Sequence, residues 1–477
     1  MTGSKKSLKP INEEIFRAYD IRGIIGEEWC LNNDYHDAFL IGQAIGYQLI
    51  NRDNPIPANI IIGRDGRVSS QKLSEKLIQG LLSTGCNVTD IGLVATPIVY
   101  FALSHLGVAN SVMVTGSHNP ADHNGIKIVY ESMPLNSAAI KSLYFDIIHN
   151  RIHDTPKAQG DLNNINNMMA EYQQAIADDI NIQRPMRIGI DASNGATALF
   201  SEKLFTTLGC EVFPLYCELD GTFPNHSPDP TVPENLIALT RLVTDNNLDI
   251  GIAFDGDGDR MIAVDNEGKI LWPDRIMILL AEELLKEYPH SAIVFDVKCS
   301  FLLPKAIREF GGQPSMCISG HSYLKMQMLK LNAIMGGEFS GHIVLPDRWS
   351  FFDDGPYIAA RLLELLSDTT LSTSDVFNQI PDSHSTPEYK LSFKHTAEAK
   401  LLLTQFIKHA DFPDADLSLI DGIRVDYDDA WGLIRSSNTA ASLTIRFEAL
   451  SKLRLIEIQN QFKKVLSKID NNQELPF

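Results

Sequence analysis

Three aspartates stand at alternate positions in the segment Asp255-Gly256-Asp257-Gly258-Asp259. The segment Asp249-Ile250-Gly251-Ile252-Ala253-Phe254 predicts a buried strand, so the three carboxylates follow the end of that strand. Carboxylate oxygens are the ligands that hard divalent cations prefer, and the glycines permit the dihedral angles that turn the three side chains inward. Neighbouring carboxylates repel one another, which disfavours a purely structural role. The segment therefore predicts a divalent metal site.

Two other motifs with this spacing fit less well. An EF-hand loop that begins at Asp255 requires glycine where Arg260 stands and glutamate where Asn266 stands. A phosphatase motif of the Asp-x-Asp-x-Thr type has threonine at the position of Asp259. The aspartate segment resembles neither.

Ser117 follows a second buried strand, which we expect over residues 112–115. Gly116 ends this strand, and Asn119-Pro120 closes a turn, because the proline ring disfavours a helical residue before it. Open α/β sheets bind ligands at this end of their strands. A loop serine that bonds to its own backbone is the alternative interpretation, and the Gly-x-Ser-x-Gly spacing of a hydrolase is absent.

Two further loops carry groups that bind sugars and phosphates. Glu338 and Ser340, in Gly-Gly-Glu-Phe-Ser-Gly-His, are suited to vicinal sugar hydroxyls, although a glycine turn between strands is an equal alternative. The segment Arg435-Ser436-Ser437-Asn438-Thr439 combines a guanidinium with neutral donors, as a phosphate clamp does, or else it forms a cap or turn. Lys127 and His321 follow other short strands and add a cation and an imidazole.

The elements that must position these loops alternate between strand and helix. Strands are expected at 59–63, 86–91, 187–191 and 292–296, and helices after Ser69 or Ser70 and from Thr96-Pro97 to Leu106. A strand, a polar turn, a helix, a glycine and another strand recur three times, which indicates a triplicated α/β domain with mostly parallel, doubly wound sheets. Beyond a polar segment at 382–395 that contains Pro387, a strand and the helix 450–469 predict a small α+β domain.

The composition restricts the kinds of partner. The net charge of −19 disfavours nucleic acid and anionic membranes, so an anionic ligand must be held by clustered Arg and Lys. No apolar run is long enough to span a bilayer, and residues 1–15 are polar, without the apolar region of a signal peptide. The six cysteines are scattered without a Cys-x-x-Cys spacing, which is typical of buried thiols in a reducing cytoplasm.

Taken together, these motifs resemble those of the α-D-phosphohexomutases, in particular the bacterial phosphomannomutase/phosphoglucomutase branch. The resemblance runs from Phe16 to about Glu448. It rests on Phe-Arg-Ala-Tyr-Asp-Ile-Arg-Gly at 16–23, Thr-Gly-Ser-His-Asn-Pro at 115–120, Asp-Gly-Asp-Gly-Asp-Arg at 255–260, Asp-Asp-Gly at 353–355 and Asp-Gly-Ile-Arg-Val-Asp at 421–426. It implies three related α/β domains (1–160, 161–268 and 269–382) and a C-terminal α+β domain (383–477) similar to TATA-binding protein, around a central cleft.

The resemblance also implies a reaction. Ser117 would carry a phosphoryl group and donate it to a sugar monophosphate, and the bisphosphorylated intermediate would return its other phosphate to Ser117. Mg²⁺ would be held by Asp255, Asp257, Asp259 and an oxygen of Ser117, and glucose 1,6-bisphosphate would act as activator. The other implied catalytic residues are His118, Lys127, Arg260 and His321. The implied substrate-binding residues are Tyr19, Arg22, Lys298, Glu338, Ser340, His342, Arg435, Ser437, Asn438 and Thr439.

Contacts to O3, O4 and one phosphate do not involve C2, where glucose and mannose differ, so both sugar phosphates are expected as substrates.

Phe339 and the segment 437–439 depart from the glucosamine branch, which favours Gln and Ser-Gly-Thr there. Phe339 also replaces a usual Met, Ser227 a frequent His and Ala441 a common Pro. A phosphoglucosamine mutase, a metal-dependent phosphatase and a non-catalytic sugar-phosphate sensor are the alternatives. We expect a cytoplasmic monomer, with a dimer as the alternative.

Overall fold

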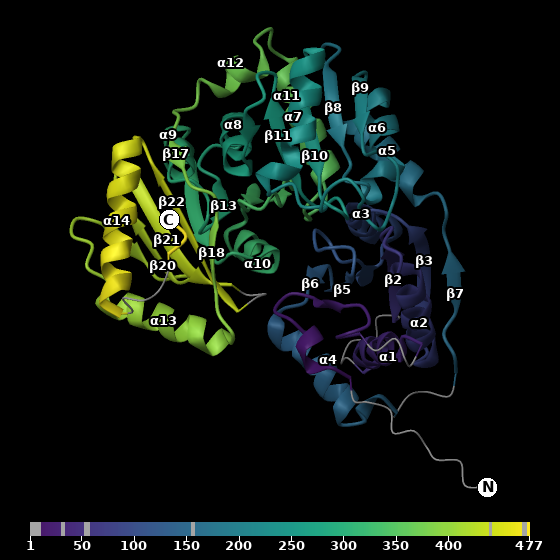
Figure 1. The fold of residues 1–477 in the computed structure, drawn as a ribbon. Coiled ribbons are helices and arrows are strands. Elements are labelled where there is room, and N and C mark those ends of the chain that lie inside the picture. The colour runs from purple at the N-terminus through teal and green to yellow at the C-terminus, as the bar shows by residue number, and fades with distance from the viewer. Residues whose placement is uncertain (1–10, 30–33, 52–57, 154–157, 438–440, 470–474) are drawn as a thin grey trace. The chain divides into compact units, whose positions relative to one another are not determined.

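The computed structural model describes residues 11–29, 34–51, 58–153, 158–437, 441–469 and 475–477 (Figure 1). The chain forms two compact units. The first unit contains residues 1–271 and 348–373, and the second contains residues 272–347 and 374–477. The described residues of each unit form two β-sheets.

The N-terminal sheet of the first unit has the strand order β1-β5-β4-β2-β3-β7, with β6 paired to β5. Its strands are β1 (Ile21–Ile24), β2 (Asn59–Arg64), β3 (Asn87–Leu93), β4 (Ser111–Val114), β5 (His123–Tyr130), β6 (Met133–Pro134) and β7 (Leu162–Asn164). Strands β4, β2, β3 and β7 are parallel neighbours, whereas β1, β5 and β6 pair in the antiparallel sense. The parallel arrangement is thus limited to one side of the sheet.

Helices cover both faces of this sheet. They are α1 (His36–Ile50), α2 (Ser70–Ser83), α3 (Thr96–Leu106) and α4 (Ser137–Ile148), and α5 (Met168–Asp179) packs on α3. Ile60 and Ile62 of β2 join the core beneath α1 and α2, while Ile61 between them is equally buried outside that core. Because successive strand residues point to opposite faces, both faces are covered, as predicted for a doubly wound sheet. Ile11 and Ile15 are also buried, so the start of the described chain packs into the core, although residues 1–15 read as a polar segment.

The second sheet of the first unit has the order β12-β11-β10-β8-β9. Its strands are β8 (Arg187–Asp191), β9 (Glu211–Leu215), β10 (Ile250–Phe254), β11 (Met261–Asp265) and β12 (Ile270–Leu271), and its helices are α6 (Ser201–Thr207), α7 (Ile237–Asn246) and α11 (Gly355–Ser367). β10 is parallel to β8 and antiparallel to β11, so the short turn between β10 and β11 carries residues 255–260. Helix α11 packs on β10 and β11 although it follows them by a long stretch of sequence that includes the whole of another sheet.

The first sheet of the second unit has the order β14-β13-β15-β16. It contains β13 (Ala292–Asp296), β14 (Gln313–Cys317), β15 (Met335–Gly337) and β16 (Ile343–Val344), with α8 (Pro273–Glu287), α9 (Leu302–Glu309), α10 (His321–Leu331) and the short α12 (Thr373–Phe377), whose first residue belongs to the first unit. β13 is parallel to β14 and β15, and β16 is antiparallel to β15. Residues 338–342 form the turn between β15 and β16.

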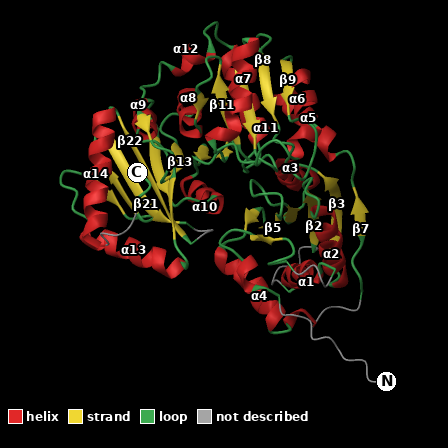
Figure 2. Cartoon of the chain, viewed as in Figure 1, coloured by secondary structure: helices red, strands yellow, loops and turns green. Residues whose placement is uncertain are grey.

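The C-terminal sheet is antiparallel, in the order β17-β22-β21-β20-β19 with β18 also paired to β22. Its elements are β17 (His384–Ser385), β18 (Tyr389–Ser392), β19 (Asp416–Ser418), β20 (Ile423–Asp426), β21 (Ala430–Ser436) and β22 (Ser442–Ala449), with helices α13 (Thr396–His409) and α14 (Lys452–Ile469) packed on β21 and β22 (Figure 2). This is the predicted α+β arrangement. The polar segment 382–395 is not a plain linker, because two of its stretches become strands that pair with β22.

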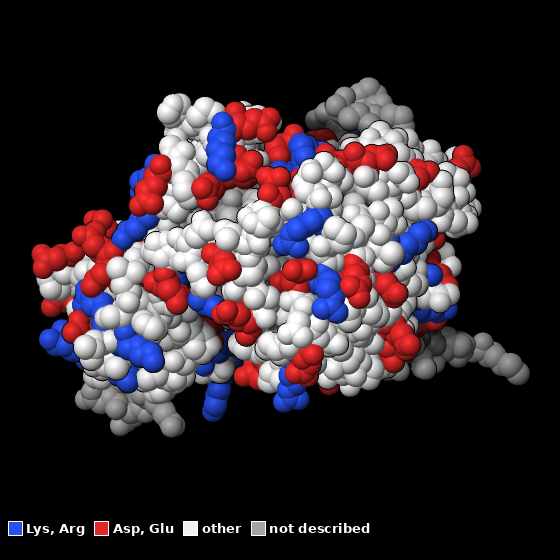
Figure 3. Space-filling model, turned by 90° about the horizontal axis from the view of Figure 1, so that it is seen from above, with Lys and Arg blue, Asp and Glu red and all other residues white. Residues whose placement is uncertain are grey.

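The distribution of surface charge and the burial of the cysteines can be compared with what the composition indicates. On the face that Figure 3 shows, lysine and arginine side chains are scattered among acidic ones. Cys86, Cys210, Cys299 and Cys317 are buried free thiols, and Cys217 is half-buried. Among the described residues, none of the helices has both the length and the apolar character that a membrane span needs. Cys30 lies outside the described residues.

Candidate functional site

The first unit brings Ser117 and the aspartate turn together. Ser117 Oγ donates to Asp255 Oδ2 at 3.2 Å and lies 3.2 Å from His118 Nδ1. The two turns approach so closely that a Cβ on Gly256 would lie 2.5 Å from the Ser117 carbonyl oxygen. Glycine at position 256 therefore permits the approach, which brings Ser117 next to the aspartate turn.

The three aspartates are buried and form a group whose carboxylate oxygens lie within 4.8 Å of one another. Lys127, on β5, places Nζ 2.7 Å from Asp257 Oδ2 and also bonds to Asp259. Thr96 Oγ1, at the start of α3, donates to Asp257 as well. Asp257 Oδ1 is buried and has no hydrogen-bond partner among the described residues, which is the kind of oxygen that a cation would satisfy. The donor set thus fits a hard divalent metal ion.

Charge crowding in this group changes its titration. Burial raises the pKa of Asp255 well above its ordinary value, and the charges of Asp257 and Asp259 raise it further. Burial also opposes the charge of Asp257, but Lys127 outweighs it and lowers the pKa of that carboxyl. The pKa values of the two carboxyls of one turn are thus shifted in opposite directions by burial and by Lys127.

Several other predicted residues of the first unit surround this centre. Arg260 Nε lies 3.7 Å from Asp255 Oδ2 and 4.0 Å from Asp259 Oδ1. Arg22, on β1, donates from Nη1 to Asn119 Oδ1 at 3.0 Å, which brings a second guanidinium to the turn that carries Ser117. Tyr19 is half-buried in the turn before β1. Together with Lys127, these arginines set three cationic side chains against the carboxylates.

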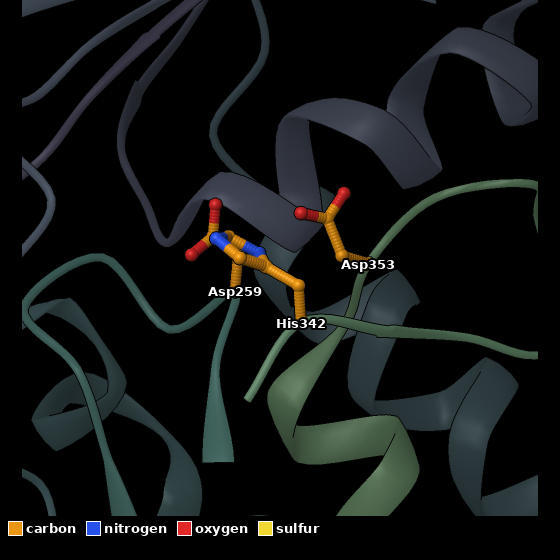
Figure 4. Close-up of side chains that lie close together, drawn as sticks. All are labelled: Asp259, His342 and Asp353. Carbon is orange, nitrogen blue, oxygen red and sulfur yellow. The ribbon is translucent and has the colours of Figure 1, made fainter. Parts of the chain in front are cut away.

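Three residues of the first unit were not predicted as part of the site. Asp353 precedes α11, is fully buried, and brings a carboxylate oxygen within 4.8 Å of one from Asp259 (Figure 4). Thr96 contacts Asp257, and Arg67 bonds to the Ser117 carbonyl at 2.6 Å. Arg67 follows β2, Thr96 begins α3 and Asp353 lies just before α11, so the available signal was the place of each in the α/β pattern together with its polar side chain.

The second unit gathers another group of predicted residues. Glu338 Oε1 accepts hydrogen bonds from the Gly320 amide at 2.7 Å and from Ser319 Oγ at 3.4 Å, next to His321 at the start of α10. The rings of His321 and His342 are stacked with centroids 5.6 Å apart. Lys298 Nζ lies 3.3 Å from Glu388 Oε1. Ser340 lies half-buried in the same turn as Glu338.

Burial is the main influence on the pKa of Glu338, which it raises, and the nearby charge of Asp296 acts in the same direction. His342 and Lys298 oppose this rise. Burial would also lower the pKa of Lys298, but the carboxylates of Glu388, Asp296 and Glu338 outweigh it and raise the pKa. The group is a buried, mixed-charge cluster with oxygen acceptors and a fixed cation.

The predicted phosphate loop begins at the end of β21. Arg435 Nε donates to Asp421 Oδ2 at 2.8 Å, and the same oxygen accepts from the Ser319 amide at 3.1 Å, so the guanidinium is tied to the start of α10. Ser437 donates its amide to the Ser442 carbonyl at 2.8 Å. Asn438 and Thr439 lie outside the described residues. Arg435 and Ser437 therefore stand at the entrance of the hairpin between β21 and β22.

Comparison with known proteins accounts for the whole arrangement. Four sequence profiles match in order: phosphoglucomutase/phosphomannomutase alpha/beta/alpha domain I at residues 13–151, domain II at 170–268, domain III at 272–384 and the C-terminal domain at 394–465. The phosphomannomutase/phosphoglucomutase of Pseudomonas putida is 42% identical over 466 residues, which cover 98% of each chain. The phosphoglucomutase of Neisseria meningitidis serogroup A is 41% identical over 97% of this chain and 98% of its own.

A solved structure supports the same assignment. The crystal structure of a phosphoglucomutase/phosphomannomutase family protein from Burkholderia thailandensis superposes with a TM-score of 0.90 at 39% identity, over 98% of this chain and 100% of that chain. The profiles, the relatives and this structure agree along nearly the full sequence. The chain belongs to the phosphoglucomutase/phosphomannomutase family.

Proposed function

We propose that this chain is a phosphohexomutase that interconverts the 1- and 6-phosphates of mannose and of glucose. The observation that carries the proposal is the position of Ser117 Oγ, 3.2 Å from both Asp255 Oδ2 and His118 Nδ1 at a buried carboxylate triad. A serine at such a centre is suited to accept and donate a phosphoryl group. The family membership and the names of the relatives support the same activity.

The proposed reaction begins with phosphorylated Ser117. The bond between the Ser117 oxygen and phosphorus breaks while the free hydroxyl oxygen of a bound sugar monophosphate bonds to phosphorus. That hydroxyl passes its proton to a general base, for which His321 is the candidate, and the serine oxygen that is released takes a proton from His118. The hexose 1,6-bisphosphate then returns its other phosphate to Ser117 by the reverse step.

The cationic side chains neutralise the phosphoryl oxygens in this scheme. Lys127, Arg260 and Arg22 contact the carboxylates or the Ser117 turn, so they flank the transferred group. Mg²⁺ is the proposed metal ion, held by Asp255, Asp257, Asp259 and an oxygen on Ser117, and it would supply further charge neutralisation. Glucose 1,6-bisphosphate is the proposed activator because it would phosphorylate an unmodified Ser117.

Substrate recognition is proposed for the second group of residues. Glu338 and Ser340 would bind O3 and O4 of the sugar, with Lys298 and His342 alongside. Tyr19, in the first unit, is a further substrate-binding candidate. Arg435, Ser437, Asn438 and Thr439 would bind the phosphate that does not react. None of these contacts involves C2, the carbon at which glucose and mannose differ. The phosphates of both sugars should therefore be accepted as substrates. We also propose domain boundaries after residues 160, 268 and 382. The chain is further proposed to act as a cytoplasmic monomer.

Phosphorus NMR tests the activity directly. The protein is mixed with Mg²⁺, a trace of glucose 1,6-bisphosphate, and the 1-phosphates of mannose, glucose and glucosamine. Mannose and glucose 6-phosphates should appear at comparable rates, and Ser117→Ala should abolish both. Ser104→Ala is the matched control, because Ser104 Oγ donates only to the Phe101 carbonyl within α3 among the bonds of the described residues. Free phosphate without 6-phosphates, turnover of glucosamine 1-phosphate alone, or no change would contradict the proposal.

A further inference from the structure

Arg67 lies two residues beyond Asp65, just after β2, and its side chain is fully buried. Its Nε donates to Asp65 Oδ2 at 3.2 Å. Nη1 donates to the carbonyls of Pro120 at 2.6 Å and His123 at 3.0 Å. Nη2 donates to the carbonyls of Ser117 at 2.6 Å and Asn119 at 2.7 Å. A guanidinium has five N–H groups, so every one of them is used and four hold a single loop.

That loop connects β4 to β5 and carries Ser117. Ser117 has a φ of 50°, in the left-handed region that residues with a side chain rarely adopt. Such a conformation persists only where surrounding contacts determine it. Two contacts do so: the Ser117 amide donates to Thr115 Oγ1 at 2.8 Å, and the Ser117 carbonyl accepts from Arg67. The serine side chain is left to point at Asp255.

The guanidinium also explains the glycine before the serine. A Cβ on Gly116 would lie 2.6 Å from Arg67 Cζ, and its three nearest atoms would all belong to Arg67. The φ of Gly116 lies outside the left-handed region, so the backbone itself accepts alanine. Glycine is required at position 116 because Arg67 lies against the loop.

Asp65 anchors the guanidinium in turn. Asp65 Oδ1 accepts from the Arg67 amide at 3.1 Å and from Ser70 Oγ. Asn124, at the start of β5, donates to Ser69 Oγ at 2.8 Å and to Ser70 Oγ at 2.9 Å. The network therefore joins the end of β2, the start of α2 and the start of β5, and the loop is held from both ends.

We infer that Arg67 is a positioning residue for phosphoryl transfer: its fork fixes the Ser117 loop in the conformation that aims Oγ at the aspartate turn. The inference rests on the proposed function. Arg67 contacts neither the sugar-binding group nor the aspartate turn by any hydrogen bond found in the described residues, so it acts through Ser117 and not through substrate affinity.

The first test compares Arg67→Lys and Arg67→Gln with the wild-type enzyme. Lysine keeps the charge but cannot reach four carbonyls at once, so kcat should fall by about 100-fold in both variants, with KM within about threefold. The decisive readout is the single-turnover rate at which phosphorylated Ser117 transfers to glucose 1-phosphate. A merely structural role would reduce the folded fraction and leave that rate unchanged.

Arg187→Lys is the matched control. Arg187 belongs to the same unit and also donates to two backbone carbonyls, those of Asn246 at 2.8 Å and Asn247 at 3.1 Å. Its transfer rate should equal that of the wild-type enzyme. Wild-type rates in the Arg67 variants would overturn the inference, whereas an inactive wild-type protein would overturn the proposed function instead.

A double-mutant cycle removes the question of folding. Gly116→Ala keeps every Arg67 donor but pushes the guanidinium from the loop, so kcat should also fall. In the Gly116→Ala/Arg67→Gln double variant, the loss should not exceed that of Arg67→Gln alone, since the guanidinium that the added Cβ would displace is already absent. Multiplied losses would overturn the inference. If Arg67→Gln does not fold, Gly116→Ala decides alone, and a wild-type kcat in that variant would contradict the role of Arg67.

Discussion

Phe339 lies between the two sugar-binding candidates Glu338 and Ser340, and it carries a stacked cation. The Arg446 guanidinium lies 3.5 Å from the centroid of its ring, and Trp272 packs beside it at 5.4 Å. Arg446 also donates to the Lys298 carbonyl. The aromatic ring thus joins the β15–β16 turn to the C-terminal sheet within the second unit.

We expect Phe339→Met to destabilise the second unit by about 1 kcal/mol, the usual size of a partly desolvated cation–π contact. The ratio of the kcat/KM values for mannose 1-phosphate and glucose 1-phosphate should stay within about threefold of the wild-type ratio. The reason is that the ring contacts a guanidinium and takes no part in recognising C2 of the sugar. Thermal unfolding and paired kinetics measure both effects. Phe301→Met is the control, because it removes another cation–π contact of the second unit: Lys305 Nζ lies 4.8 Å from the centroid of the Phe301 ring. A change of the ratio by about tenfold would assign sugar selection to Phe339.

Residues with contiguous motifs could be predicted, and residues that act across the fold could not. Ser117 and the three aspartates are recognisable because neighbouring residues supply the whole chemical pattern. Arg67 could not be predicted, because its acceptors are carbonyls 50 to 56 residues away that any sequence would provide. Asp353 was recognised as part of a motif without a role, since nothing local indicates which carboxylate it approaches.

At the scale of elements, the start of α11 supports the aspartate turn. The Gly355 amide donates to the Gly258 carbonyl at 3.1 Å, and a Cβ on Gly355 would lie 2.8 Å from the carbonyl oxygens of both Gly258 and Arg260. Asp354 caps the helix by accepting from the Tyr357 amide at 2.9 Å and also accepts from Tyr172 at 2.7 Å. Helix α11 is thereby fixed against the metal-binding candidates.

Gly355→Ala should displace the aspartate turn. We expect metal affinity, measured by calorimetry, to fall at least about tenfold and stability to fall by about 1–3 kcal/mol, as overpacking against backbone does. Gly107→Ala is the control: Gly107 has a φ of 64° and open space around the position of an added Cβ, so only backbone strain results. Equal metal affinities in the two variants would contradict this role of α11.

A second element-scale contact is sensitive to pH. His226 Nε2 lies 3.0 Å from Asp191 Oδ2 at the end of β8. Burial would lower the pKa of His226, but the hydrogen bond and charge of Asp191 outweigh it and raise the pKa above 6.5. The folded state thus binds the proton of His226 more tightly than the unfolded state does. The contribution of this proton to the free energy of unfolding is complete below pH 6.5, and it is lost as the pH rises through the higher pKa of the folded state.

His226→Gln should therefore remove a decline in stability that the wild-type protein shows above pH 6.5. Denaturant unfolding between about pH 5 and 9 measures the difference, which should be largest in the acid range. His149→Gln, at an exposed ring that contacts the Phe145 carbonyl, is the control. Parallel stability curves for His226→Gln and the wild-type protein would show that the pair does not titrate in this range.

Element types were easier to predict than element partners. Strands β2, β8 and β13 and helices α3 and α14 follow from apolar runs and period, and their bounds agree closely. The polar stretch at 382–395 gave no such signal, because β17 and β18 lie at a sheet edge and most of their side chains are exposed. The packing of α11 on β10 and β11 could not be predicted. It depends on which apolar faces meet in the fold, and the apolar pattern of a helix does not indicate the partner of its apolar face.

At the scale of the molecule, buried or half-buried cationic side chains lie where we propose that anionic substrates bind. The net charge is −19, yet Lys127 and Arg22 lie at the Ser117 centre of the first unit. Lys298 and Arg435 lie at the proposed sugar-binding group of the second. The scattered surface charge in Figure 3 contrasts with these groups, which are largely withdrawn from solvent. Anionic sugar phosphates are thus expected to be attracted by local groups and not by the overall field.

The two units should respond differently to a metal ion. The carboxylates of the aspartate turn all belong to the first unit, so a bound cation stabilises the fold of that unit by linkage, about 2.7 kcal/mol at a metal concentration of about 100 Kd. Hydrogen exchange with and without Mg²⁺ measures this. Protection should rise at 95–127 and 250–265 and remain unchanged in the C-terminal sheet at 384–449.

Asp257→Asn provides the control for that experiment. It replaces the buried oxygen without a partner among the described residues and weakens the contact with Lys127, so the Mg²⁺-dependent protection should disappear at 95–127 and 250–265. Asp220→Asn, at an exposed turn where the carboxylate accepts only from Thr222 among the bonds of the described residues, should keep it. Protection that rises equally at 384–449 would mean that the metal acts on the chain as one cooperative body, because linkage protects every segment that unfolds with its binding site.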